Sequence, residues 1–430
     1  TITDGSSTST VNLGTLNLRQ VGGATSVVIT EYDGTVTSTA GTISSTNIQA
    51  ININGPVGLT TLGMTLTSVS SNGGANGISI QDTNGSFTVT GNGTTDASGG
   101  TIQNITNRGG SFISATNISL SNMNFINANT FDNAEPAEPA VALGNNASVN
   151  GALHFATVTG VTLDNLNITS SVQQGINGHT VNNFTLRNSA LLNLGTGADE
   201  DGLHFFNMLG TNEITNTTIT SSGDDNVNIQ NNSGTSTITI TGGSFNTGVL
   251  GSGLLFGPRG TNTTTINISG VTSNNNFSGG VVADASDTAD MNITVTNSTI
   301  TNNNDGIQIS AASGDVDFDV DDNDFVGNDF LAINILKAAF STGGTLDGYI
   351  RNNNPITIAN GITADAIMAF QAGGGRLAVA ITGNTINYAG TQRAILLQAG
   401  QDGNGTLQAT VAGNTIDIQL DGAGNAVAGV

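Results

Sequence analysis

The sequence contains no cysteine and no tryptophan, and only eight of its 430 residues are lysine or arginine. Without cysteine, disulfide bonds cannot hold the fold together. Thirty-one acids oppose the eight bases and give a net charge of −23. This charge repels phosphate backbones and anionic lipid headgroups, so neither nucleic acid nor a membrane surface is expected as a partner. It also keeps a large surface soluble.

Long hydrophobic runs are absent as well. No stretch approaches the ~20 consecutive apolar residues of a membrane-spanning helix, so we expect no membrane insertion. No signal peptide is visible, and the sequence opens at Thr1 rather than at methionine. We therefore expect a mature protein, or a segment of a longer one, that is secreted or displayed on a cell surface.

Short strands with alternating apolar and polar residues fill the chain instead. Thr235–Thr241, Thr264–Ile268 and Asn292–Thr296 show this period of two, which is typical of half-buried strands. Glycine, asparagine and aspartate separate the strands, as turn residues do. The composition therefore indicates an ordered all-β protein.

The strands belong to a repeat of three strands per unit, and one anchor position recurs at intervals of 23 to 31 residues. The anchor is apolar at all positions but one: Ile168, Leu191, Ile219, Phe245, Ser273, Ile300, Phe325, Ile356, Ile386 and Ile416. A single unit cannot bury its inward side chains, whereas stacked units share one core. We therefore predict an all-β, right-handed parallel β-helix of about 16 three-strand rungs, forming a single domain over residues 1–430.

Two regions depart from this regularity. Residues 1–110 repeat less clearly, and we expect less regular rungs there. The step from Phe125 to Ile168 is too long for one rung, and residues 131–152 contain an Ala-Glu-Pro-Ala-Glu-Pro run. These residues are predicted to form an inserted loop. No capping helix is visible at either end, which favours flanking domains or an end-to-end homo-oligomer or fibre.

Acidic motifs in two consecutive repeats provide candidate catalytic residues. The segments Asp199–Phe205 and Ser222–Val227 resemble the acidic rungs of polygalacturonase-type pectin hydrolases. The resemblance implies that Asp201, Asp224 and Asp225 are acid/base carboxylates, since glycoside hydrolysis requires paired carboxylates. The histidine and the Arg-x-Lys that follow in that family have no counterpart here. The alternative is that these carboxylates cap backbone amides at turns.

A second resemblance covers most of residues 110–430. Gly-Asn-Thr-Ile at 383–386 and 413–416, and Asn-Ser-Thr-Ile at 297–300, are similar to β-helix repeat passengers of bacterial surface and adhesin proteins. That similarity implies a structural or adhesive rod that is not an enzyme and that binds a surface glycan or a host or cell-surface ligand. A polysaccharide-degrading glycoside hydrolase or lyase is the alternative function.

Metal-ligating residues are few. Asp317, Asp319 and Asp321 lie on one face of an alternating strand and are candidate calcium ligands, because calcium binds carboxylate oxygens. The alternative is a solvated acidic face. His154 and His204, like His179, lie far apart in sequence, so each is expected to be structural or exposed rather than a zinc ligand. No other cofactor is expected.

Overall fold

The computed structural model describes residues 1–93, 95–132, 150–359, 362–400 and 404–418. The fold is a right-handed parallel β-solenoid, which confirms the predicted fold class. It has about 14 turns rather than the predicted 16, because several turns are longer than the assumed average repeat. Within the described residues, no helix is long and apolar enough to cross a membrane.

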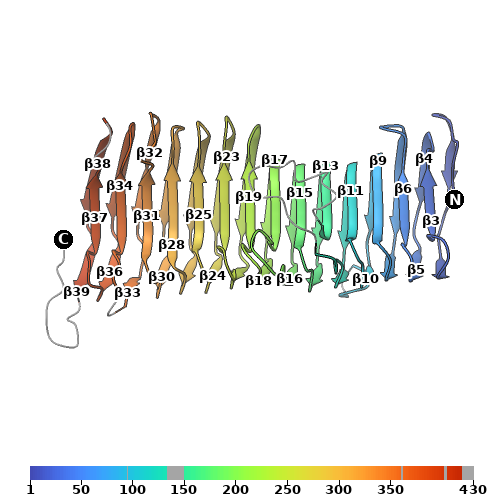
Figure 1. Ribbon diagram of the computed structural model, residues 1–430, viewed down its shortest axis with the longest axis horizontal. Helices are drawn as coiled ribbons and strands as arrows, with labels where there is room; N and C mark the ends of the chain where they lie inside the picture. The colour runs from blue at the N-terminus through green and yellow to red at the C-terminus, as the bar shows by residue number, and fades with distance from the viewer. Residues whose placement is uncertain (94, 133–149, 360–361, 401–403, 419–430) are drawn as a thin grey trace. The chain divides into compact units, whose positions relative to one another are not determined.

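The chain divides into two compact units, residues 1–223 and 224–430, each a stack of parallel strands (Figure 1). The strands of the first unit are β1 (Thr10–Asn12), β2 (Leu18–Val21), β3 (Val27–Thr30), β4 (Gly34–Ser38), β5 (Thr42–Thr46), β6 (Ile51–Asn54), β7 (Thr60–Leu66), β8 (Ser68–Asn72), β9 (Asn76–Val89), β10 (Gly100–Gln103), β11 (Arg108–Ser121), β12 (Met123–Ile126), β13 (Gly151–Asp164), β14 (Asn167–Thr169), β15 (Gln174–Arg187), β16 (Ala190–Leu194), β17 (Leu203–Thr215) and β18 (Thr218–Ser222).

The strands of the second unit are β19 (Val227–Asn231), β20 (Thr235–Thr241), β21 (Ser244–Asn246), β22 (Leu254–Pro258), β23 (Thr263–Ser269), β24 (Thr272–Asn274), β25 (Gly279–Ala285), β26 (Asp290–Thr296), β27 (Thr299–Thr301), β28 (Asp305–Ala311), β29 (Val316–Asp321), β30 (Asp324–Val326), β31 (Leu331–Lys337), β32 (Thr345–Arg351), β33 (Ile356–Ile358), β34 (Ile367–Gln371), β35 (Arg376–Thr382), β36 (Thr385–Tyr388), β37 (Ile395–Ala399), β38 (Thr406–Ala412) and β39 (Thr415–Ile418).

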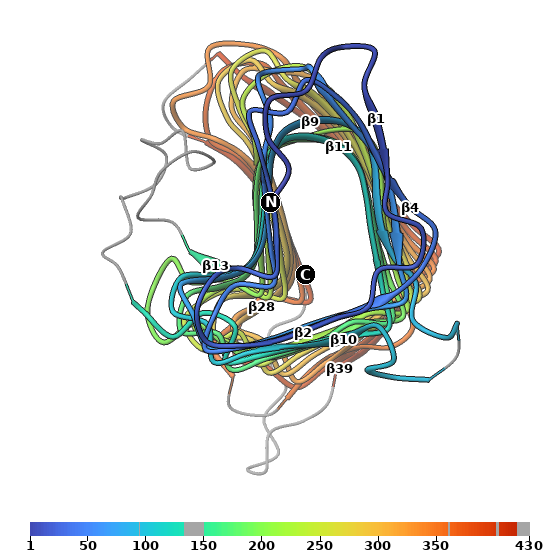
Figure 2. The same ribbon diagram turned by 90° about the vertical axis from the view of Figure 1, so that its right-hand side faces the viewer.

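Each turn of the solenoid contributes strands to three faces, as the end-on view in Figure 2 shows for both units. In the second unit three separate strands make a turn, for example β25, β26 and β27. In the first unit β9, β11, β13 and β15 each run through 14 residues and bend from one face onto the next. Long unbroken strands therefore form the part of the first unit that carries the candidate site.

The apolar anchors form columns in the predicted register within each unit. In the first unit Phe125 pairs with Ile168 and Ile168 with Leu191; in the second, Phe245 pairs with Ser273 and Ser273 with Ile300. The exception, Ser273, is fully buried and donates its hydroxyl to the backbone oxygen of Gly280 at 2.8 Å. A hydrogen-bonded serine thus replaces one apolar group without leaving a polar atom unpaired.

The region from 1 to 110 is more regular than its sequence indicates. Leu18 pairs with Ile43 and Ile43 with Val69, so its short strands stack in register like those further along. Most of the predicted loop, residues 133–149, lies outside the described residues. The predicted end of that loop is wrong by two residues, because Gly151–Asp164 is strand β13.

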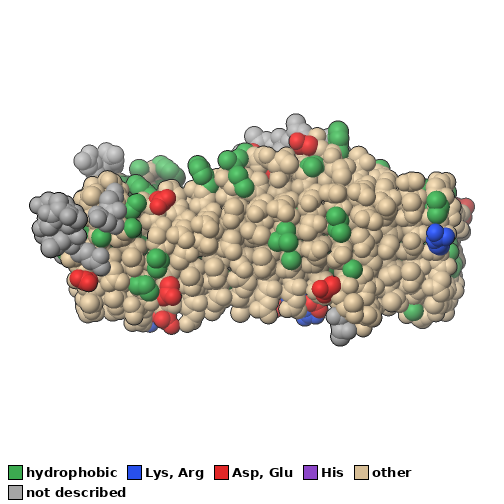
Figure 3. All heavy atoms as spheres, turned by 90° about the horizontal axis from the view of Figure 1, so that it is seen from below, with side chains coloured by type: hydrophobic (Ala, Val, Ile, Leu, Met, Phe, Trp, Pro, Cys, Tyr) green, Lys and Arg blue, Asp and Glu red, His purple; other side chains and the backbone are tan. Residues whose placement is uncertain are grey.

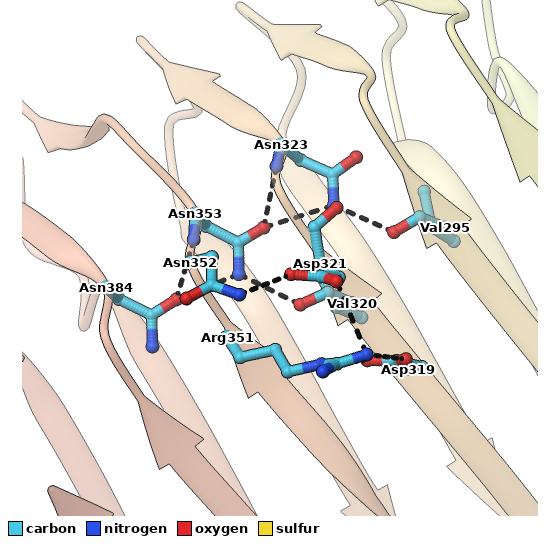
Figure 4. Close-up of polar contacts among 9 residues, drawn as sticks. All are labelled: Val295, Asp319, Val320, Asp321, Asn323, Arg351, Asn352, Asn353 and Asn384. Atoms are coloured by element: carbon cyan, nitrogen blue, oxygen red, sulfur yellow. Dashed lines mark hydrogen bonds and ion pairs between the residues drawn. The ribbon is translucent and has the colours of Figure 1, made fainter.

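Buried asparagines connect successive turns of the second unit (Figure 4). Asn353 Oδ1 accepts the backbone N–H of Asn323 at 3.0 Å, and Asn384 Oδ1 accepts that of Asn353 at 3.0 Å. Each side-chain amide also donates to the next Oδ1 and to a backbone carbonyl, such as that of Val320 at 3.0 Å. At this corner of the solenoid, strand pairing leaves backbone N–H and C=O groups without hydrogen-bond partners, and the asparagine ladder provides them.

The surface is mostly uncharged. On the face drawn in Figure 3, uncharged polar side chains and backbone cover most of the area, and acidic side chains are scattered. The net charge of −23 is therefore not gathered into one acidic patch on this face.

Candidate active site

Four polar residues form a row across the central strands of the first unit. Ser111 on β11 pairs with His154 on β13, His154 with Asn177 on β15, and Asn177 with His204 on β17. All four side chains are buried. We call Ser111, His154, Asn177 and His204 the polar row.

The polar row points away from the hydrophobic core. Side chains alternate between the two faces of a strand, so residues on either side of a row member point inward. Leu153 and Phe155 flank His154 and are fully buried, and Phe155 stacks on Phe112 with ring centroids 5.2 Å apart. The polar row therefore occupies the outer face of this sheet, although all four of its side chains are buried.

The third histidine lies on the same face. His179 pairs with Ala156 on one side and with Phe206 on the other, and its ring stacks on that of Phe206 at 5.5 Å. Burial lowers the pKa of His179, and a hydrogen bond with its own backbone opposes that shift. Their spacing in the sequence does not reveal that the three histidines lie on one face. His154 and His204 lie two strands apart, on the order of 10 Å.

Asp201 forms a buried pair with His204. His204 Nδ1 lies 2.6 Å from Asp201 Oδ2, and the Asp201 side chain is fully buried. The backbone N–H of Asp201 donates to Gln174 Oε1 at 2.6 Å, and Gly175 N–H donates to the Asp201 carbonyl at 3.0 Å. These bonds fix the carboxylate at the point where the chain enters β17. A carboxylate in this position orients the imidazole and stabilises its protonated form.

Asn177 has an unsatisfied side chain at the centre of the polar row. It is fully buried, and neither its Oδ1 nor its Nδ2 has a hydrogen-bond partner in the described part of the chain. Nδ2 of the buried Asn150, which lines a hollow with Ser111 of the polar row, is also without a partner there. A buried amide without partners costs stability, so one that persists needs an explanation such as a bound ligand.

A positively charged side chain, that of Arg108, lies beside the polar row. Arg108 lines a hollow of about 270 Å³ together with Ser79, Gln81, Ser111 and Asn150. Burial lowers the pKa of Arg108 to about 10, which leaves the guanidinium charged at neutral pH. The hollow joins the polar row through Ser111 and offers hydroxyl, amide and guanidinium groups to a polar ligand.

Capping of backbone amides at a turn was the alternative role predicted for Asp201. In the structure this role belongs to its neighbour, Glu200. The Glu200 carboxylate accepts the backbone N–H groups of Thr196 and Gly197, and burial is the main cause of its raised pKa. Glu200 therefore stabilises a turn. The Asp201 carboxylate instead faces an imidazole.

The other two predicted carboxylates belong to the second unit. Asp225 is buried and its Oδ1 accepts the backbone N–H of Ser252, whereas Asp224 is half-buried. A side chain at Gly251 would clash with Oδ1 of both aspartates, which explains the glycine. A catalytic role for Asp224 and Asp225 stays a prediction.

Two of the three calcium candidates, Asp319 and Asp321, lie beside Arg351 (Figure 4). Arg351 binds both carboxylate oxygens of Asp319, at 3.1 and 2.7 Å, and lies 3.3 Å from Asp321. Asp317, on the same strand, lines a hollow together with Asp319. The guanidinium thus supplies positive charge where calcium was predicted, and calcium binding stays a prediction.

Comparison with known proteins gives few matches. No protein-family model and no curated protein matches the chain. Among solved structures, the chain is similar to the catalytic unit of a thermostable GH87 alpha-1,3-glucanase from Streptomyces thermodiastaticus, at 14% identity and a TM-score of 0.33. The alignment covers 94% of this chain and 64% of that chain, less than two thirds of its length.

This finding corrects one prediction. The repeat pattern favoured a protein that is not an enzyme, whereas the similar solved structure is a glycoside hydrolase. The similarity itself concerns the fold.

Proposed function

We propose that the protein is a polysaccharide-cleaving enzyme whose acid–base centre is the Asp201–His204 pair. The observation that carries this proposal is the 2.6 Å contact between two buried ionisable side chains on the outer face of the sheet. Polar contacts of this kind, buried beside an unsatisfied amide, are typical of sites that bind and convert a ligand. Such an enzyme would work outside the cell, where structural polysaccharides occur.

The proposed roles follow from the chemistry of each group. His204 transfers a proton during cleavage, since imidazole works near neutral pH. Asp201 holds the ring and stabilises the imidazolium. The Asn177 amide donates to and accepts from sugar hydroxyls, and Arg108 binds polar substituents at the edge of the site.

The polar row suits a chain-like substrate. Its four strands lie about 4.8 Å apart, so the row extends over roughly 15 Å, which matches the length of several linked sugar units. Hydrogen-bonding groups along this line would hold an extended polymer across the strands.

The test is a cleavage assay on a panel of neutral and acidic polysaccharides. Release of reducing ends indicates cleavage, and an ultraviolet-absorbing unsaturated sugar distinguishes elimination from hydrolysis. We expect Asp201→Asn to lose about 100-fold or more of the activity. The matched control is Asp164→Asn, which removes a half-buried carboxylate paired with Arg187 and should leave activity unchanged. Absence of cleavage on every polymer, or full activity in Asp201→Asn, would contradict the proposal.

Self-association and an adhesive surface ligand stay predictions from the sequence. Sedimentation velocity over a range of concentrations tests the first, because end-to-end stacking produces a series of larger species. A single species at all concentrations would exclude it.

A further inference from the structure

A trough lies on the outer face of the second unit, and none of the residues that line it belongs to the polar row. Its floor is formed by Ala378 and Ala380 on β35. Taller side chains stand on both sides: Asp347 and Tyr349 on β32, and Gln408 and Thr410 on β38. The hollow measures about 480 Å³, and we call it the alanine trough.

An aromatic ring forms one wall of the alanine trough. Tyr349 is 55% exposed, which is unusual for a large apolar side chain on a strand. Its ring lies 5.7 Å from the guanidinium carbon of Arg351, and Asp319 holds that guanidinium through two hydrogen bonds. The cation–π contact restrains the ring, so little conformational entropy is lost when a ligand stacks on it.

Polar groups line the same hollow. Arg376 bonds Asp347 Oδ2, and the backbone of Ala378 forms a further hydrogen bond with the Asp347 carboxylate. Burial raises the pKa of Asp347; Arg376 opposes this shift and Asp317 adds to it. Asn292 and Gln408 add amide groups to the lining. The alanine trough therefore combines a flat apolar floor and ring with acceptors and donors at its edges.

We propose that the alanine trough binds a neutral glycan chain, as a site distinct from the proposed catalytic face. Sugars present an apolar C–H face, which packs on a tyrosine ring, and a rim of hydroxyls, which bond to carboxylate and amide groups. The charge selects against acidic sugars, because three carboxylates and one guanidinium, that of Arg376, line the trough. The inference goes beyond the proposed function, because binding here needs no reaction.

Binding is measured by affinity gel electrophoresis in gels that contain soluble neutral glucans, xyloglucan or galactomannan, followed by calorimetry with the best binder. Wild-type protein should be retarded by a neutral glycan and less by polygalacturonate. Tyr349→Ala should weaken the neutral interaction about tenfold or more, since a central aromatic anchor is lost. Tyr349→Phe keeps the ring and should bind within about twofold of the wild type.

Two controls separate the site from its surroundings. Phe277→Ala removes another exposed aromatic of the same unit, outside the trough, and should leave binding unchanged. Asp201→Asn should also bind normally, so that loss of cleavage and loss of binding are distinguishable. The proposal is overturned if no neutral glycan retards the wild type, or if Tyr349→Ala binds as the wild type does while circular dichroism shows both folded.

Discussion

His204 and Asp201 lie three residues apart in sequence and meet at 2.6 Å at the entry to β17. Neither side chain reaches solvent to an appreciable extent. A buried ionisable pair contributes little to stability compared with apolar side chains of the same size. Its presence on the outer face of the sheet is therefore better explained by chemistry than by folding.

If the pair acts as one unit, its two members should not contribute independently. We expect Asp201→Asn and His204→Gln each to lower kcat/KM by about 10²–10⁴-fold, and the double variant to be no worse than the poorer single variant. Steady-state kinetics on the best substrate from the panel provide the measurement. Losses that multiply in the double variant would show that the residues act separately.

Asn177 should show opposite effects on activity and stability. Replacing it with leucine, of similar size, removes a buried amide that has no partner within the described residues. Asn177→Leu should therefore raise the free energy of unfolding by about 1 kcal/mol and lower kcat/KM. Urea unfolding and kinetics test both effects on one preparation. A variant that is less stable and equally active would assign Asn177 a packing role instead.

The core columns and the candidate carboxylate Asp201 could be predicted from sequence, whereas the polar row was not. Ile168 and Leu191 are apolar residues separated by the repeat interval. Because such residues must be buried, only one strand-pairing register is compatible with them. His154 and Asn177 are separated by the same interval and lie in one outward-facing row. The members of that row are of different residue types, so they do not form a recognisable repeat as the apolar residues do. Applying the repeat spacing to polar residues as well as apolar ones would have aligned them.

The predicted calcium site shows a second reason why a contact could not be predicted from the sequence. An alternating acidic strand, Asp317 to Asp321, was recognisable from sequence, but its partner was not. Arg351 follows one turn later, at a position that depends on the length of the intervening loop. Loop length varies between turns, so the contact becomes visible only in the structure.

The asparagine ladder should be sensitive to a single truncation. Asn353→Ala leaves the backbone N–H of Asn323 and the carbonyl of Val320 without their side-chain partners. We expect a loss of about 2–4 kcal/mol in the free energy of unfolding. The control Asn387→Ala changes an asparagine on β36 outside the ladder and should stay within about 0.5 kcal/mol of the wild type. Equal stabilities of the two variants would show that the ladder contributes nothing.

Calcium should compete with Arg351 for the same carboxylates. In Arg351→Met, Asp319 and Asp321 lose their cation, and like charges on one strand face repel. Millimolar calcium should therefore raise the melting temperature of the variant more than that of the wild type. Differential scanning calorimetry with calcium and with EDTA measures the difference. An equal response of both proteins would place any calcium elsewhere.

Lys337 gives the second unit a pH-dependent stability. Its side chain is fully buried, and Nζ donates to the carbonyl of Ala312 at 2.6 Å. Burial lowers its pKa from 10.5 to about 8, although Asp315 and Asp347 partly oppose the shift. Between about pH 8 and 10.5 the unfolded chain therefore holds the proton more tightly than the folded one does. Stability should rise with pH across that window, because the unfolded state binds more protons.

Lys337→Met isolates this effect, since it keeps the apolar stem and removes the titrating group. The free energy of unfolding from urea titrations at pH 7, 8, 9 and 10 should increase in the wild type relative to the variant. The gap should stay constant below pH 8, where Lys337 is protonated in both states. Subtracting the two curves removes the titration of tyrosines and other groups, which is common to both proteins. A difference that does not change from pH 7 to 10 would show that the folded protein leaves the lysine pKa near its ordinary value.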